Sequence, residues 1–163
     1  EVKVAGFDLG EEERQARKHL AFVPDVPRFF LELTAWEHLR FIAAANESLE
    51  GFDQRAEKLL RDFKLWHVRD HFPHRFSRGM RLKLGLLLGL IRPSSVLLLD
   101  EPTSALDQEG TQLLIEELQR RKTAGSAILL SSHDPTLAEK LADRKILLFE
   151  GHLTFTPLEN GQS

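Results

Sequence analysis

The segment Val96–Pro102, which reads VLLLDEP, constrains the fold more than any other part of the chain. A continuous apolar run bounded by polar residues is typical of a strand buried on both faces, as in a parallel sheet. Such a strand carries Asp100 and Glu101 to the carboxyl edge of the sheet, where open α/β sheets bind ligands. Two carboxylates there suit phosphoryl transfer, in which one acid holds Mg²⁺ and another orients the attacking water. Taken alone, a strand that ends in an ordinary polar turn explains the same residues equally well.

Strand and helix patterns alternate outside the middle of the chain. Apolar runs bounded by turn residues predict strands, and apolar residues at helical spacing, such as Leu114 and Leu118, predict helices. The expected strands are Val2–Ala5, Ala21–Val23, Ser95–Leu99, Ala127–Leu130 (again buried), Lys145–Phe149 and Leu153–Phe155, and the expected helices here are Glu11–His19 and Gln108–Arg121. Glu150-Gly151 is a typical hairpin turn between the last two strands. The alternation favours an α/β fold with a mostly parallel sheet.

The middle of the chain is predicted to be mostly helical. Thr34 followed by Glu37 is a capping-box pattern, so we expect a helix from there to about Ala45. Further helices are expected over Phe52–Lys64 and Arg81–Ile91.

These predictions divide the chain into three parts. Residues 1–24 and 92–163 would form the α/β core, and residues 34–91 an inserted helical subdomain. Residues 25–33 would form an extended linker held by Pro24 and Pro27.

Composition limits the classes of function. The net charge of −3 lacks the basic excess of nucleic-acid-binding proteins, so no nucleic-acid partner is expected. The chain has no cysteine, which excludes disulfides and thiolate metal sites. The longest apolar stretch, around Leu86–Ile91, is far shorter than the roughly 20 residues that span a bilayer.

Three further motifs accompany the two carboxylates. Ser104–Asp107 follows them directly, and His133 follows the next predicted buried strand. Phe76–Met80 precedes a helix, where the Ser77 hydroxyl and the N–H groups near Gly79 can face an anion. Taken singly, His133 is explained as a surface or capping histidine and Ser77 as an N-cap.

In this order and spacing the motifs resemble those of an ATP-binding-cassette (ABC) ATPase domain. The matches are Leu97–Glu101 with the Walker B strand and its glutamate, Ser104–Asp107 with the D-loop, His133 with the switch histidine, Phe76–Met80 with the signature motif, and Pro24–Thr34 with the Q-loop. Two positions depart from the family. The signature carries Arg78 and Met80 instead of Gly and Gln, a form similar to that of exporter-type cassettes, and Asp25 replaces the Q-loop glutamine.

The resemblance implies a RecA-like P-loop NTPase core that uses ATP and Mg²⁺. It implies that Asp100 orients Mg²⁺ through water, that Glu101 polarises the hydrolytic water, and that His133 contacts the γ-phosphate. Ser77 and Gly79 would clamp the nucleotide of a partner domain across a dimer, and Asp107 would couple the two sites. Asp25 would accept a bond from a Mg²⁺-bound water, unless it is only a solvated turn residue between two prolines.

The resemblance also implies a function. The protein is expected to be the ATP-hydrolysing subunit of an ABC transporter, and the signature form indicates export. It would pair with a second cassette domain and dock, through residues 25–91, on a membrane permease at the cytoplasmic face of the membrane. Two alternatives remain at this point: a cassette ATPase that acts on ribosomes or DNA, and a non-catalytic dimer partner.

No phosphate-binding loop occurs in these 163 residues. The loop needs G-x-x-x-x-G-K-[ST], and none of the ten glycines is followed by lysine. The family places this loop before Val2, and the chain begins at Glu1 with Met80 as its only methionine. We therefore expect an N-terminally truncated domain that is inactive by itself.

Overall fold

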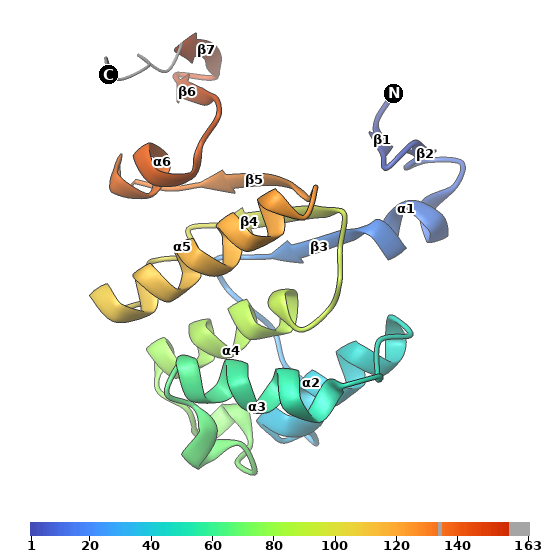
Figure 1. Ribbon diagram of the computed structural model, residues 1–163, viewed down its shortest axis with the longest axis vertical. Helices are drawn as coiled ribbons and strands as arrows, with labels where there is room; N and C mark the ends of the chain where they lie inside the picture. Colours follow the sequence, from blue (N-terminus) through green and yellow to red (C-terminus); the bar gives the residue numbers. More distant parts are fainter. Residues whose placement is uncertain (134, 157–163) are drawn as a thin grey trace.

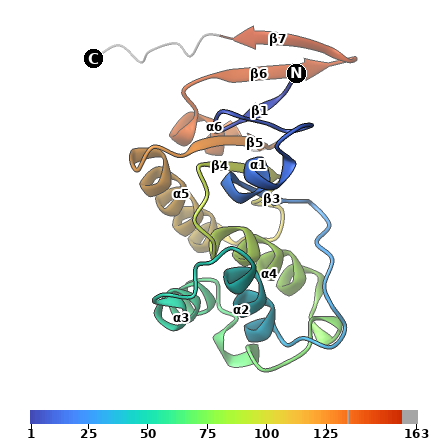
Figure 2. The ribbon, with the colours of Figure 1, turned by 90° about the vertical axis from the view of Figure 1, so that its right-hand side faces the viewer.

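A computed structural model describes residues 1–133 and 135–156. Its helices are α1 (Glu13–His19), α2 (Ala35–Ala45), α3 (Phe52–Asp62), α4 (Arg78–Leu90), α5 (Gln108–Thr123) and α6 (Pro135–Leu141), with short 3₁₀ turns η1 (Trp66–Val68) and η2 (Pro73–Arg75). Its strands are β1 (Lys3–Val4), β2 (Phe7–Asp8), β3 (Leu20–Val23), β4 (Val96–Asp100), β5 (Ala127–Ser131), β6 (Lys145–Phe149) and β7 (His152–Thr156). The central sheet lies between a helical region, α2 to α4, and the β6–β7 hairpin (Figures 1 and 2).

The central sheet is parallel, as predicted. Its strand order is β3-β4-β5, and both pairs of neighbours run in the same direction. In this register Val23 pairs with Leu99, and Asp100 pairs with Ser131. The carboxyl ends of the three strands therefore meet at one edge of the sheet.

The two ends of the described chain form small antiparallel pairs. The β6–β7 hairpin is confirmed, and its turn residues Glu150 and Gly151 have φ of 48° and 79°. Two successive left-handed residues are the requirement of a type I′ hairpin turn. The β1–β2 pair lies at the other end, joined to α1.

The expectation that β4 and β5 are buried on both faces is wrong for the described residues. Leu97 and Leu99 are buried, in the same hydrophobic cluster as residues of α4 and α5. On the opposite face of the sheet Phe22 is 58% exposed and Leu129 is 63% exposed. The helices supply packing on one face only, so a continuous apolar run here does not mean two covered faces.

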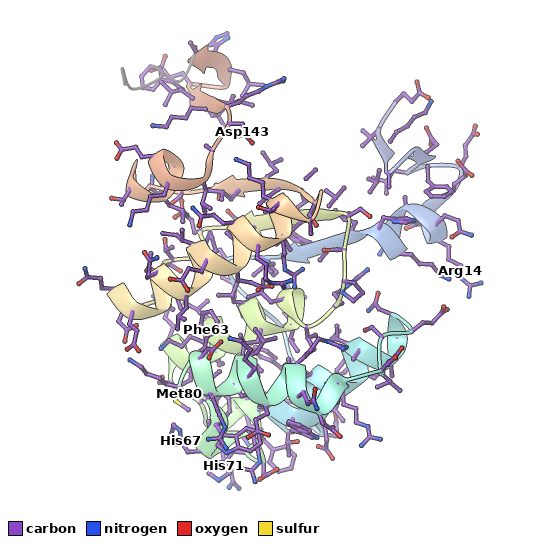
Figure 3. All side chains as sticks on the ribbon, in the orientation of Figure 1. Arg14, Phe63, His67, His71, Met80 and Asp143 are labelled. Atoms are coloured by element: carbon purple, nitrogen blue, oxygen red, sulfur yellow. The ribbon has the colours of Figure 1, made fainter. Side chains whose placement is uncertain are left out.

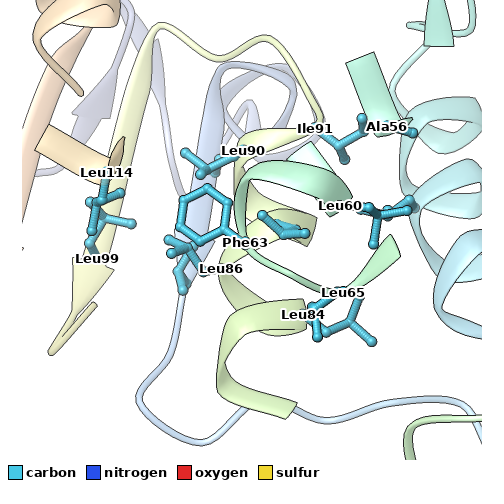
Figure 4. Packing of buried hydrophobic residues seen from close by; sticks show 14 of the residues in the cluster. Ala56, Leu60, Phe63, Leu65, Leu84, Leu86, Leu90, Ile91, Leu99 and Leu114 are labelled. Atoms are coloured by element: carbon cyan, nitrogen blue, oxygen red, sulfur yellow. The ribbon is translucent and has the colours of Figure 1, made fainter. Parts of the chain in front are cut away.

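One hydrophobic cluster joins the sheet to the helical region. Figure 4 shows Leu99 and Leu114 on the sheet side, Phe63 and Leu90 between, and Leu60 on the helical side. Helices α2, α3 and α4 thus share one hydrophobic core with the sheet.

Helix α4 approaches the sheet closely because of two glycines. A Cβ at Gly85 would lie 2.5 Å from the Cβ of Pro27, and one at Gly89 would overlap Cγ2 of Val23. These positions leave no room for a side chain, so the glycines let α4 lie directly against β3 and the linker that follows it.

The start of one helix differs from the prediction, and the cap of another agrees with it. Helix α4 begins at Arg78, three residues before the expected Arg81, because Ser77 is its N-cap and accepts a hydrogen bond from the Met80 N–H. The capping box of α2 is confirmed, with Thr34 and Glu37 exchanging both hydrogen bonds. No helix among residues 1–133 and 135–156 has the length and apolar character needed to cross a bilayer.

Candidate functional site

The predicted carboxylate Asp100 ends strand β4, beside Ser131 at the end of β5. The Oγ of Ser131 donates a hydrogen bond to Oδ1 of Asp100 at 2.6 Å. The same Oγ accepts a hydrogen bond from the backbone N–H of Glu101 at 3.1 Å. One hydroxyl therefore links both predicted acids of the site.

Glu101 and His133 face one another across the edge of the sheet. The Nε2 of His133 lies 3.4 Å from Oε1 of Glu101, and its backbone N–H donates to Oε2 at 3.4 Å. Both contacts are at the long end of the hydrogen-bonding range. The side chain of His133 is 98% exposed and that of Glu101 26% exposed, so the imidazole faces the solvent and the carboxylate lies behind it.

The backbone of Glu101 is unusual. Its φ is 46°, in the left-handed region that residues with a side chain rarely adopt. Such conformations cluster at active sites, where surrounding contacts hold them. Here the Ser131 hydroxyl binds the Glu101 N–H, which is one such contact.

Asp100 has the donor chemistry for water-mediated binding of Mg²⁺. Carboxylate oxygens are the ligands that this hard cation takes, and it keeps several of its waters. Only Oδ1 of Asp100 is engaged with Ser131, and the residue is exposed. The described residues contain no group of three acidic or histidine side chains that could hold a metal ion.

Asp107 lies at the start of α5 and not in the strand-end cluster. Its Oδ1 caps the helix by accepting from the Gly110 N–H at 2.9 Å, and its Oδ2 pairs with Nζ of Lys64 at 3.0 Å. The Gly110 N–H and then Lys64 lower the pKa of Asp107. Glu109, 2.7 Å from Nζ, and then Asp107 raise the pKa of Lys64. The contacts of Asp107 therefore tie the end of α3 to the D-loop segment within one chain.

Ser77 and Gly79 lie together at the N-terminus of α4. The Ser77 hydroxyl accepts from the Met80 N–H at 3.2 Å, and the space where a Gly79 side chain would lie is open. Met80 itself is partly buried against the core. Figure 3 labels it in the helical region of the molecule. The hydrogen bonds and ion pairs of the described chain join neither Ser77 nor Gly79 to Asp100 or Glu101. The structure thus gives two groups of site residues, on different elements.

Asp25 follows β3, near the edge where the other two strands end. It is half-buried, between Pro24 and Pro27. Further along the same linker, the Phe30 N–H donates to Nε2 of the buried His38 at 2.9 Å. The middle of the linker is therefore held against α2.

Three residues that position parts of the candidate site and of the linker were not singled out from the sequence. Ser131, Lys64 and His38 act through long-range contacts, to Asp100, Asp107 and Phe30. For Ser131 a signal existed, since it lies at a predicted strand end two residues before His133. Lys64 and His38 lie inside predicted helices and carried no such signal.

A wide hollow elsewhere on the molecule contains none of the predicted site residues. It lies between α1, the exposed sheet face with Phe22 and Leu98, and the end of α2 near Glu47. Its walls include Arg17 and Arg92. The predicted site residues and this hollow are therefore separate features of the molecule.

Comparisons with known proteins agree on one family. The family model for ABC transporters matches residues 1–104. An uncharacterized ABC transporter ATP-binding protein of Bacillus subtilis, YthP, is 37% identical over 134 residues, which cover 82% of this chain and 57% of that protein. The macrolide export ATP-binding/permease protein MacB of Campylobacter jejuni is 31% identical over 94% of this chain and 24% of its own length.

Solved structures give the same result. An ATP-binding subunit of an ABC transporter superposes with a TM-score of 0.87 at 32% identity, covering 94% of this chain and 65% of that one. A dimeric bacterial ABC transporter cassette superposes with a TM-score of 0.76 at 23% identity, which supports the fold. The chain spans a little over half of YthP and a smaller share of MacB.

Proposed function

The chain belongs to the ABC transporter family, and on that premise we propose that it forms the hydrolytic part of an ATPase subunit that powers transport through a separate permease. The observation that carries the proposal is the cluster of Asp100, Glu101 and His133 at the carboxyl edge of a parallel sheet. This is where open α/β sheets bind ligands, and its groups are those that phosphoryl transfer requires.

Each residue of the cluster has a defined part in the proposed reaction. Glu101 accepts a hydrogen bond from the attacking water and orients it toward the γ-phosphate of ATP. His133, which faces the solvent beside it, donates a hydrogen bond to a γ-phosphate oxygen. Asp100 holds Mg²⁺ through water, and the ion supplies neutralisation of phosphate charge when bound.

Variants at His133 test the proposed ATPase activity. The assay measures phosphate release from Mg²⁺-ATP by a cassette domain in which a phosphate-binding loop accompanies these residues. His133→Ala should lower turnover at least about 100-fold, in the range of one lost electrostatic contact in the transition state, while ATP binding changes little. His67→Ala, at an exposed histidine of the helical region, is the control. Equal turnover in both variants would remove His133 from the mechanism.

Ser77 and Gly79 are proposed to serve a partner's nucleotide in a head-to-tail dimer. Their place at a helix N-terminus, with open space at Gly79, suits contact with phosphate oxygens. Mixing this chain with a complete cassette domain whose own signature serine is replaced tests the idea. Recovered ATPase activity is the expected result, and no recovery would count against the proposal. Asp107 would couple the two sites from the adjoining D-loop, and Asp25 would contact a Mg²⁺-bound water.

The permease is proposed to dock on the linker and the helical subdomain. Phe30 is 54% exposed and Phe41 48% exposed, and their rings meet edge to face at 5.4 Å. This docking places the subunit at the cytoplasmic face of the membrane. The Ser-Arg-Gly-Met signature and the similarity to MacB support export.

Two matched variants test the docking site. Phe30→Asp should reduce stimulation of ATPase activity by the reconstituted permease while basal activity is kept. Leu49→Asp changes an exposed leucine of the helical region, 48% exposed against 54% for Phe30, and should leave the stimulation intact. If both variants were stimulated like the wild type, the docking site would be elsewhere.

A further inference from the structure

We propose that Ser131 is a positioning residue for the hydrolytic site, which it serves by fixing Asp100 and Glu101 at once. The inference rests on the proposed ATPase function and adds to it a residue that acts through Asp100 and Glu101. It is drawn from the two hydrogen bonds of one hydroxyl and from the backbone conformation of Glu101.

The two hydrogen bonds use the hydroxyl in complementary ways. A serine hydroxyl has one donor and two acceptor positions. Its proton is given to Oδ1 of Asp100 at 2.6 Å, a distance typical of a charge-assisted bond to a carboxylate. One of its lone pairs receives the Glu101 N–H at 3.1 Å. The Ser131 side chain therefore fixes both the carboxylate of Asp100 and the backbone of Glu101.

For Asp100 the consequence is a fixed carboxylate plane. With Oδ1 held by Ser131, rotation about the terminal torsion of Asp100 breaks the hydrogen bond. The other carboxylate oxygen is thereby kept available for the water shell of a cation. Without the hydroxyl, Asp100 is an exposed side chain that must be ordered each time Mg²⁺-ATP binds, so turnover should require a higher Mg²⁺ concentration.

For Glu101 the consequence is a held backbone. Its φ of 46° is unfavourable for a residue with a Cβ. The Ser131 hydroxyl gives the Glu101 N–H a hydrogen-bond acceptor at the point where the strand pairing ends. The conformation turns the Glu101 side chain toward His133, 3.4 Å away. Loss of the bond should let Glu101 return to an ordinary conformation and move its carboxylate away from the water that it orients.

Ser131 is not needed for the core or for the pairing of the strands. Ser131 is exposed at the end of an edge strand, so replacing it by alanine leaves no cavity in the core. The β4–β5 pairing is made by backbone atoms and remains. Ser126 provides a matched comparison, because it lies just before the other end of β5 and its hydroxyl donates to the carbonyl of Ser94 at 3.0 Å.

The experiment compares Ser131→Ala, Ser131→Thr and Ser126→Ala. Turnover is measured at varied Mg²⁺ and ATP in a cassette domain with its phosphate-binding loop, and amide hydrogen exchange is measured at Glu101. Ser131→Ala should lower kcat by about 10-fold or more, as expected for a lost hydrogen bond to a charged group. It should also raise the Mg²⁺ concentration for half-maximal rate several-fold and speed Glu101 exchange by about 10-fold. The KM for ATP should change much less.

The two other variants test whether the lower activity of Ser131→Ala comes from the missing hydroxyl at this position. Ser131→Thr keeps the hydroxyl on a residue well suited to a strand, and should restore most of kcat and of the Glu101 protection. Ser126→Ala should leave kcat, Mg²⁺ dependence and Glu101 exchange as in the wild type. The proposal is overturned if Ser131→Ala leaves Glu101 exchange and Mg²⁺ dependence unchanged, or if Ser131→Thr behaves like Ser131→Ala. The exchange measurement needs no turnover, so its result stands even where the proposed ATPase function fails.

Discussion

The buried side chain of His38 accepts a hydrogen bond from the backbone N–H of Phe30 at 2.9 Å. Its other ring nitrogen, Nδ1, donates to the carbonyl of Thr34 at 2.8 Å. Because an N–H only donates and a carbonyl only accepts, the two bonds together require a neutral ring with its proton on Nδ1. His38 is 2% exposed, and the ring of Phe29 meets its imidazole edge to face. His38 is therefore a tether between α2 and the linker that carries Phe30.

Two amide substitutions at His38 separate its two bonds. In His38→Asn the amide nitrogen can take the place of Nδ1 and keep the bond to Thr34, whereas the bond to Phe30 is lost. In His38→Gln the longer side chain can reach the place of Nε2 and accept from Phe30. Amide exchange at Phe30 should therefore be about 10-fold faster in His38→Asn than in His38→Gln. Equal rates in the two variants would show that the tether does not hold the linker.

Alanine substitutions along α4 should show opposite effects on stability. Gly→Ala in a helix normally stabilises by about 0.5–1 kcal/mol. At Gly89 and Gly85 the new methyl group meets Val23 and Pro27, and overpacking of this kind costs about 1–3 kcal/mol. Gly89→Ala and Gly85→Ala should therefore lower the free energy of unfolding, measured by urea denaturation. Gly79→Ala, where the space is open, is the matched control and should leave it equal or higher. A gain at all three positions would contradict the close packing of α4 on β3.

Acid should weaken the contact between Glu117 and the two arginines that follow it. Burial opposes ionisation of Glu117, but the hydrogen bonds from Arg120 and Arg121 outweigh it and hold the pKa of this carboxyl below its ordinary value. The buried Arg121 also donates to the carbonyl of Leu90, the last residue of α4. A carboxyl with a lowered pKa in the folded state stabilises the protein above its unfolded pKa, about 4.3. That contribution disappears as the pH falls through the folded pKa.

Glu117→Gln isolates this contribution. The difference in free energy of unfolding between wild type and variant should be largest near pH 7 and should shrink as the pH falls below about 4.3. Glu116→Gln, one residue earlier and exposed, is the control and should show a smaller pH-dependent difference. A difference for Glu117→Gln that grows on acidification would have the wrong sign for the contacts described.

Local patterns predicted the elements that depend on neighbouring residues. The Thr34–Glu37 capping box, the Glu150-Gly151 turn and strand β4 each follow from a few adjacent side chains, and the structure confirms them. The predicted start of α4 at Arg81 is three residues late, although Ser77 was itself recognised as a possible N-cap.

Contacts between distant segments could not be predicted in the same way. The exposed face of β5 depends on which side of the sheet receives helices, and an apolar run such as Ala127–Leu130 does not encode that side. The bond between Ser131 and Asp100 needs the β4–β5 register, which residues 31 positions apart in sequence do not reveal. Local sequence thus identified the acids of the candidate site but not the residue that orients them.

The most direct measurement of the central claim uses Glu101→Gln in a cassette domain with its phosphate-binding loop. ATP turnover and equilibrium ATP binding are measured on the same protein, with Glu109→Gln as a control at an exposed glutamate nearby. The substitution keeps the shape of the side chain and removes its ability to act as a base. We expect turnover to fall by at least about 100-fold while ATP binding stays within a few-fold of wild type, and the control to retain activity. Turnover that persists in Glu101→Gln would contradict the assignment of Glu101 as the group that activates water.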